Sequence, residues 1–335
     1  VRSDRGNIAE ITPPPRPVAR YFPQYHSTPE NDRVWGKGFT EWTLLKPLEL
    51  EGIRKPLPVE EGGLGFYDLM SKDTRKKQAQ FANAAGVNGF IYYHYWFSGS
   101  HAPDDLLVMY KVQEKILEDG EPNLPFAFSW ANEPWTKRWT GTANTTEDTL
   151  LSQDYGDEEE WREHFDYLLK FFKHPNYIRV QGKPMFILYR IGHIGSHLEP
   201  MLKLWRELAL EDGLPGLHIV NTIGNFRIID ENTSQIEKDA DLDASFHFWP
   251  QLHGSKIRLL DLGSIHSSAN DIAALLQTYP TQYWGAYTGF DRRPRDAADL
   301  GVFHVSVEQF DKTLACSFEG MSAKNSREIG KNYYF

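Results

Sequence analysis

The sequence has almost no cysteine, since Cys316 is the only one among 335 residues. An internal disulfide and a metal site built from several thiolates are therefore excluded, which is compatible with a reducing compartment. No run of about 18 apolar residues occurs, so no membrane span is expected. No signal peptide is visible behind Val1. The compartment stays open, with the cytoplasm slightly favoured.

Several motifs are also missing. There is no GxGxxG or Walker A loop and no GxSxG elbow, so a nucleotide fold and a serine-hydrolase site are not indicated. The twelve histidines form no HxH, HExxH or HxxxH set on a credible face, and we expect neither a metal nor an organic cofactor. A net charge of −10 argues against a nucleic-acid partner. A neutral or cationic small ligand fits better.

Aromatic residues, in contrast, make up 14% of the chain and gather into short runs. Buried strands are predicted where apolar runs occur, at 18–22, 87–97, 124–130, 183–189, 217–222, 240–249, 282–288 and 332–335. Segments with helical periodicity lie between most of them, at 73–86, 103–120, 157–174, 197–213, 231–240, 268–279 and 307–321. The acidic run 157–160 is typical of the first turn of a solvated helix.

Strand and helix in alternation predict parallel βα units. Seven units and an eighth strand favour an α/β fold of the (β/α)8 TIM-barrel type over a doubly wound open sheet. The sequence stops inside strand 8, so the barrel is expected to be incomplete at strand 8 and helix 8. An extended lead-in is predicted for residues 1–17, because they include a proline-rich stretch. Residues 18–335 are predicted to form a single catalytic-like domain. We expect such a chain to be poorly soluble or partly unfolded alone, because strand edges and an apolar seam stay uncovered.

In such a barrel the active site lies at the C-terminal ends of the strands. Polar aromatic side chains recur at seven consecutive strand ends, which suits a sugar ring with apolar faces and hydroxyl edges. The residues predicted to bind substrate are His26, Trp42, Tyr93, His94, Tyr95, Trp96, Trp130, Asn132, Trp135, Arg138, Trp139, Tyr189, Arg190, His247, Trp249, Tyr287 and Asp291.

Chemistry at a glycosidic bond needs carboxylates beside an oxocarbenium-like centre. Glu133, just after the third strand, is the best-placed candidate, and Glu41, in the long loop after the first strand, is the second. Aromatic neighbours should raise the pKa of a carboxyl group by desolvation, whereas Arg138 would lower it. Other roles stay open: Arg138 could pair with Glu133 to fix the loop, and His94 could be a satisfied core histidine. Trp135 and Trp139 could cover the barrel top without touching a ligand.

Six sequence blocks resemble a known family. They are RYFPQYHSTPENDRVWGKGFTEW (20–42), LGFYDL (64–69), GVNGFIYYHYWFSG (86–99), SWANEPWTKRW (129–139), HPNYIRVQGKPMFILYR (174–190) and WGAYTGFDRRPR (284–295). From about Ala19 onward the chain resembles the glycoside hydrolase family 99-like group, also described as the WbsX-type glycosyltransferase family.

The resemblance implies a (β/α)8 barrel that acts on polysaccharide or oligosaccharide chains without a cofactor, in a family often found with surface-polysaccharide genes. The related family 99 enzymes are retaining, endo-acting α-mannosidases that work through a 1,2-anhydro sugar. One carboxylate takes the proton of the 2-hydroxyl, and another acts as acid and then base. This pair lies in an Asn-Glu-Trp-x-x-Gly-like stretch expected after strand eight, beyond Phe335. Glu133 matches the strand-three glutamate, with a role in substrate binding or charge tuning.

Three functions follow as hypotheses. The first is a glycoside hydrolase-like, endo-acting enzyme. The second is a glycosyltransferase of surface-polysaccharide biosynthesis, although only Asp104-Asp105 and Asp241-Leu-Asp243 stand in for a DxD motif. The third is a non-catalytic, glycan-binding pseudoenzyme. In each case the partner is an oligosaccharide or polysaccharide, with no nucleic acid and no membrane span, and the oligomeric state is left open.

Overall fold

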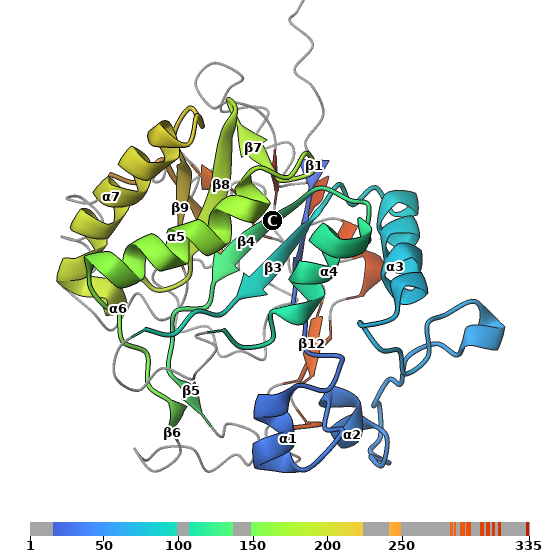
Figure 1. Ribbon diagram of the computed structural model, residues 1–335. Coiled ribbons are helices and arrows are strands. Elements are labelled where there is room, and N and C mark those ends of the chain that lie inside the picture. The colour runs from blue at the N-terminus through green and yellow to red at the C-terminus, as the bar shows by residue number, and fades with distance from the viewer. Residues whose placement is uncertain are drawn as a thin grey trace, which may run out of the picture.

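The computed structural model describes residues 16–98, 107–136, 149–223 and 241–248, and shorter stretches between 282 and 334 (Figure 1). Its main sheet is a path of parallel strands in which each strand pairs with the next one along the chain. These strands are β2 (Ala19–Tyr21), β3 (Phe90–His94), β4 (Phe126–Trp130), β8 (Lys183–Leu188), β9 (His218–Ile223), β10 (Ala244–His247) and β11 (Gln282–Tyr283).

The predicted eighth strand is present as β14 (Tyr333–Tyr334). It pairs in parallel with β1 (Arg16–Pro17), which comes just before β2 in the chain. The last residues of the expected lead-in are therefore part of a strand pair. β1 and β14 form a two-stranded sheet of their own, and strand 8 beside the start of strand 1 is the order that a (β/α)8 barrel requires. The predicted fold class is confirmed.

Helices connect the parallel strands. α3 (Lys72–Ala84) joins β2 to β3, α4 (Lys111–Asp119) joins β3 to β4, α5 (Glu158–Phe172) joins β4 to β8, and α7 (Leu198–Glu211) joins β8 to β9. Figure 1 shows α5 lying across β4 and β8. The predicted acidic first turn is correct: the Asp157 side chain accepts hydrogen bonds from the backbone N–H groups of Glu159 and Glu160 and caps α5.

Aromatic side chains fill the layer between sheet and helices. All five residues of β4 are buried, as expected for a strand covered on both faces. The rings of Phe128 and Phe171 of α5 lie 4.8 Å apart, and those of Phe186 of β8 and Trp205 of α7 lie 5.6 Å apart. Among the described residues, buried side chains of the predicted runs from Val18 to Tyr283 form one core with the helices, while Phe97 packs in a smaller cluster with Val108 and Met109.

One helix boundary was predicted wrongly. α4 begins at Lys111 rather than near residue 103, because Leu107 forms a bridge with Trp96 and Met109 has a φ of 53°. A positive φ is incompatible with the start of a right-handed helix. Two expected helices, 231–240 and 268–279, lie outside the described residues, while the described positions between 307 and 315 are helical.

Short elements that were not predicted lie within the connections between these strands and helices. They are α1 (Pro29–Trp35), α2 (Glu41–Leu45), η1 (Val59–Glu61), β5 (Trp135–Thr136), β6 (Thr149–Leu151), β7 (Arg179–Val180), α6 (Ile191–Ile194), η4 (Gly195–His197), β12 (Gly289–Asp291) and β13 (Val302–His304). β5 pairs with β6, and β12 with β13, in antiparallel fashion. α1, α2 and the β5–β6 pair lie at the end of the sheet toward which the β3 arrow points in Figure 1. They surround the strand ends where a barrel carries its site.

Candidate functional site

A hollow of about 350 Å³ lies at the C-terminal ends of β2, β3, β4 and β8. We call it the mouth hollow. Its lining residues are Phe22, Gln24, Tyr93, Tyr95, Ala131, Glu133, Pro134, Trp135, Thr136, Tyr189 and Arg295. The sequence predicted five of them as site residues: Tyr93, Tyr95, Glu133, Trp135 and Tyr189. Their strand-end positions therefore lie in one place.

Glu133 lines the mouth hollow because β4 continues beyond its last residue. The Ala131 N–H donates to the His94 carbonyl over 2.8 Å, which prolongs the pairing with β3. The Glu133 N–H then donates to the Ala131 carbonyl over 2.9 Å, which turns the chain. The carboxylate of Glu133 forms an ion pair with Arg190, with 2.5 Å between Oε1 and Nε. The partner suggested by the sequence, Arg138, lies outside the described residues.

Asn132 fixes the position of Arg190. Its Nδ2 donates to the Arg190 carbonyl and its Oδ1 accepts from the Arg190 N–H, each over 2.8 Å. The side chain is fully buried. Its amide is thus paired with backbone groups and holds Arg190, the partner of Glu133, in place.

Glu41, the second predicted carboxylate, is the first residue of α2, which begins after the capping residue Thr40. Its side chain is buried and forms an ion pair with Arg295. Arg295 lies far from Glu41 in the sequence and lines the mouth hollow. Burial raises the pKa of Glu41, and the Arg295 guanidinium acts in the opposite direction. The structure thus brings Glu41 to the edge of the hollow through Arg295.

The hollow also contains polar groups suited to hydroxyls. Gln24 is 1% exposed, and neither its Oε1 nor its Nε2 has a hydrogen-bond partner among the described residues. Burial raises the pKa of Tyr189 to about 12 and also raises that of Tyr95. Both phenols therefore stay protonated at neutral pH and can donate a hydrogen bond.

Three predicted residues lie in the core beneath the hollow. His94 and His164 share a hydrogen bond of 2.8 Å between their Nε2 atoms. The Trp96 ring stacks on His164 at 4.5 Å, and the Trp130 indole N–H donates to the Trp96 carbonyl over 3.2 Å. Because all these side chains are buried, we assign His94, Trp96 and Trp130 to supporting the site from below.

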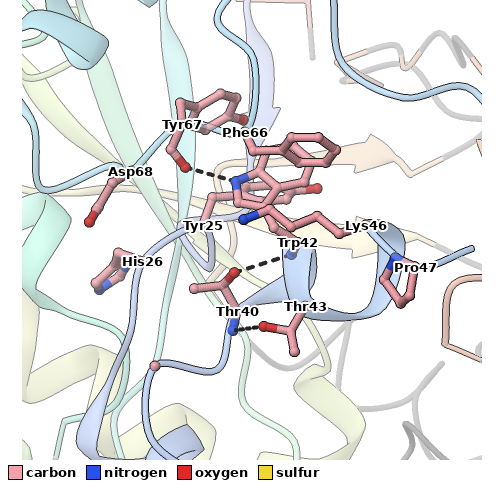
Figure 2. A pocket seen from close by; sticks show the side chains of 11 residues that line it. Tyr25, His26, Thr40, Trp42, Thr43, Lys46, Pro47, Phe66, Tyr67 and Asp68 are labelled. Atoms are coloured by element: carbon pink, nitrogen blue, oxygen red, sulfur yellow. Dashed lines mark hydrogen bonds between the residues drawn. The ribbon is translucent and has the colours of Figure 1, made fainter.

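His26 and Trp42 line a different cavity of about 720 Å³, which we call the second hollow (Figure 2). Asp291 lies in β12 and pairs with Arg293 over 2.7 Å. His247 is the last residue of β10. The predicted residues outside the described part of the chain are Arg138, Trp139, Trp249 and Tyr287.

Phe22, Gln24 and Arg295 line the mouth hollow but were not predicted as site residues. Phe22 and Gln24 directly follow the first strand, so the strand-end rule applied to them as well as to His26. Arg295 lies within the block 284–295 that carries the family resemblance. Its pairing with Glu41, 254 positions away, could not be read from local sequence.

Among the described residues, no group of three or more histidine, cysteine, aspartate or glutamate side chains is arranged to hold a metal ion. In the same part of the chain, no helix has the length and apolar character needed to cross a bilayer. The side chains that line the mouth hollow offer carboxylate, guanidinium, phenol and amide groups.

Comparison with solved structures shows what the fold is similar to. A glycoside hydrolase-like protein has a TM-score of 0.58 at 15% identity, with 95% of this chain and 86% of that chain covered. The GH99 endo-alpha-mannosidase from Bacteroides thetaiotaomicron has a TM-score of 0.50 at 12% identity, with 95% and 83% covered. At these identities the likeness shows the fold alone.

Sequence comparison shows the family. The uncharacterized protein WxcX from Xanthomonas campestris pv. campestris (strain B100) is 29% identical over 338 residues, which cover 94% of this chain and 46% of WxcX. The WxcX protein of strain ATCC 33913 gives the same figures. This chain thus spans about half the length of the curated relatives it matches. The family model of glycosyltransferase WbsX matches residues 17–329, and the chain belongs to this carbohydrate-active family.

Proposed function

We propose that this chain forms the substrate-binding barrel of an enzyme that acts on oligosaccharide or polysaccharide chains, with glycoside hydrolase-like chemistry. One observation supports this most directly: an aromatic-walled hollow at the ends of parallel strands contains Glu133, paired with Arg190, and adjoins Glu41, paired with Arg295. A volume of about 350 Å³ is that of a small-molecule site.

The walls and the polar groups of the hollow match the two surfaces of a sugar. The Trp135 indole and the Tyr93 ring offer apolar faces for the C–H side of a pyranose. The unpartnered amide of Gln24 can both donate and accept, as a pair of neighbouring hydroxyls requires. A ligand hydroxyl that pairs with this buried amide removes the cost of leaving it unsatisfied.

The two carboxylates differ in environment, which suggests different roles. Burial raises the pKa of Glu41, while its ion pair with Arg295 acts in the opposite direction, and we assign this carboxyl group as the candidate proton donor to a leaving oxygen. Glu133 is held by Arg190, and we assign its carboxylate to accepting a hydrogen bond from a sugar hydroxyl and tuning the local charge. Two carboxyl groups in unequal environments are the arrangement that glycoside chemistry uses.

Calorimetric titration tests this proposal with a panel of neutral oligosaccharides of mannose, glucose, galactose and N-acetylglucosamine. Trp135→Ala is expected to weaken binding about tenfold, the factor that corresponds to about 1.4 kcal/mol. Trp35→Ala removes a tryptophan of α1 that lines neither hollow, and should bind as the wild type does. A wild type that binds no member of the panel, or equal losses in both variants, would refute the proposal.

The family description favours a second candidate, glycosyl transfer. A transferase must bind an activated sugar donor, and saturable binding of a nucleotide sugar would support it. Release of reducing ends from a bound glycan, without any binding of nucleotide sugars, would support hydrolysis. The same protein preparation can be used for both assays.

A further inference from the structure

The second hollow lies beside the mouth hollow and is larger, at about 720 Å³. Its lining residues are Tyr25, His26, Gly38, Thr40, Trp42, Thr43, Lys46, Pro47, Phe66, Tyr67 and Asp68. Figure 2 shows these side chains gathered around Trp42. They come from the connection between β2 and α3, which is the longest excursion in the described part of the barrel.

Trp42 is held firmly at the centre of this hollow. Its indole N–H donates to the Tyr67 carbonyl over 2.7 Å, and its ring packs on Tyr25 with 4.2 Å between centroids. Phe66 meets the Trp42 ring edge to face at 5.4 Å and is 39% exposed. The exposed Phe66 ring, packed on the fixed Trp42 ring, gives the hollow an apolar wall that favours contact with the apolar face of a ligand.

The polar part of the hollow includes a buried group that points to a ligand. His26 is 1% exposed, and neither ring nitrogen makes a hydrogen bond of ordinary geometry, although the Pro23 carbonyl lies near it. A buried imidazole without partners is costly, and a ligand hydroxyl supplies what it lacks. Lys46 adds one positive charge and Asp68 one negative charge to the lining. This balance suits a neutral ligand with hydroxyl groups.

The residues that line the two hollows are neighbours in the chain, and one ion pair connects the segments that carry them. Gln24 lines the mouth hollow, and Tyr25 and His26, the next two residues, line the second. Glu41 stands between Thr40 and Trp42, which line the second hollow, while its partner Arg295 lines the mouth hollow. The Glu41–Arg295 pair therefore lies at the boundary between the two.

We propose that the second hollow binds a further, neutral sugar unit of the same glycan chain whose first unit occupies the mouth hollow. The glycan then crosses the Glu41–Arg295 pair, so that this pair faces a link between sugar units rather than the end of a chain. This inference rests on the proposed function, because it takes the mouth hollow to be a sugar site. It adds a second binding site, which only ligands of sufficient length can reach.

Ligand length gives the test. Dissociation constants would be measured by calorimetry for each sugar of the panel named above, from the monosaccharide to the hexasaccharide. With the wild type, affinity should rise at the length that reaches the second hollow. Phe66→Ala should leave the shortest bound ligands unaffected and weaken the longer ones about tenfold, the factor that corresponds to about 1.4 kcal/mol.

Phe81→Ala is the matched control. Phe81 is an exposed phenylalanine of α3 with a lysine ammonium over its ring at 5.6 Å, as Phe66 has Lys46 at 5.2 Å, but it lines neither hollow. Its loss should change no dissociation constant. Equal affinity of Phe66→Ala and wild type at every length would overturn the second site while leaving the mouth hollow intact. A wild type that binds no ligand of any length would overturn the proposed function and this inference together.

Discussion

Acid should destabilise this protein through one buried pair of histidines. His94 and His164 are each 2% exposed and face each other with 2.8 Å between their Nε2 atoms. A hydrogen bond between two Nε2 atoms needs an N–H on one ring and a lone pair on the other, so the two rings cannot both be protonated. Burial lowers the pKa of His94 to about 3, and burial with the neighbouring His94 lowers the pKa of His164 well below its usual value.

The direction of the effect follows from proton counting. Between about pH 6.5 and pH 3 the unfolded chain protonates both histidines, whereas the folded protein protonates neither. The contribution of this pair to the free energy of unfolding is therefore fully present above about pH 6.5 and is lost as the pH falls. Each histidine lowers the free energy of unfolding by about 1.4 kcal/mol for every pH unit below about 6.5. At pH 5 the two histidines together lower it by about 4 kcal/mol relative to pH 8. That is a large part of the ~5–15 kcal/mol that stabilises a typical domain.

Urea unfolding at several pH values between 8 and 5, followed by tryptophan fluorescence, measures this loss. Other histidines also titrate, so the informative quantity is the difference from the double variant His94→Phe/His164→Phe. This variant keeps two rings beside Phe128 and Trp205 but removes both titrating groups. Its free energy of unfolding should fall by about 4 kcal/mol less than that of the wild type over the same range. Parallel pH profiles of the two proteins would refute the assignment of the acid sensitivity to this pair.

Three further predictions concern the frame that carries the site. Asp157→Ala removes the cap of α5 and should lower the free energy of unfolding by about 1 kcal/mol in urea titrations. Asp119→Ala leaves the guanidinium of Arg75, which is 1% exposed, without its carboxylate and should cost about 3 kcal/mol, visible as a lower melting temperature in calorimetry. Phe172→Ala opens a cavity beneath β8 and should cost about 3–5 kcal/mol by chemical unfolding, whereas Phe172→Leu should cost clearly less.

The strand ends were the part of the site that the sequence could predict. The alternation of apolar runs and helical segments predicts parallel βα units, and parallel strands all end at the same edge. Residues one to three positions beyond a strand, such as Tyr95 and Glu133, must then lie near that edge. Tyr189 follows from the same rule, since it comes directly after β8. The structure places all three around one hollow.

The direction in which a side chain points was harder to predict. Trp130 is the last residue of β4, and its indole packs against Trp205 of α7 rather than lining the hollow. A strand that is buried on both faces has no polar alternation to reveal which face is which. The partners of Asn132 were hidden for a related reason: its amide is paired with the backbone of Arg190, 58 positions along the chain. Such tertiary partners leave no local signal.

These buried residues nevertheless bear on function, because they determine how rigid the site is. Trp130, two residues before Asn132, donates a hydrogen bond to the Trp96 carbonyl, and Asn132 donates one to the Arg190 carbonyl. The backbone just before Glu133 is therefore bonded to the segments that follow both neighbouring strands, and the Glu133 carboxylate pairs with Arg190. A carboxylate held in this way needs little reordering when a ligand arrives, so less of the binding free energy is lost to side-chain entropy. The large side chains of the segment 129–135 thus divide their tasks: Trp130 and Asn132 fix the backbone, whereas Glu133 and Trp135 line the hollow.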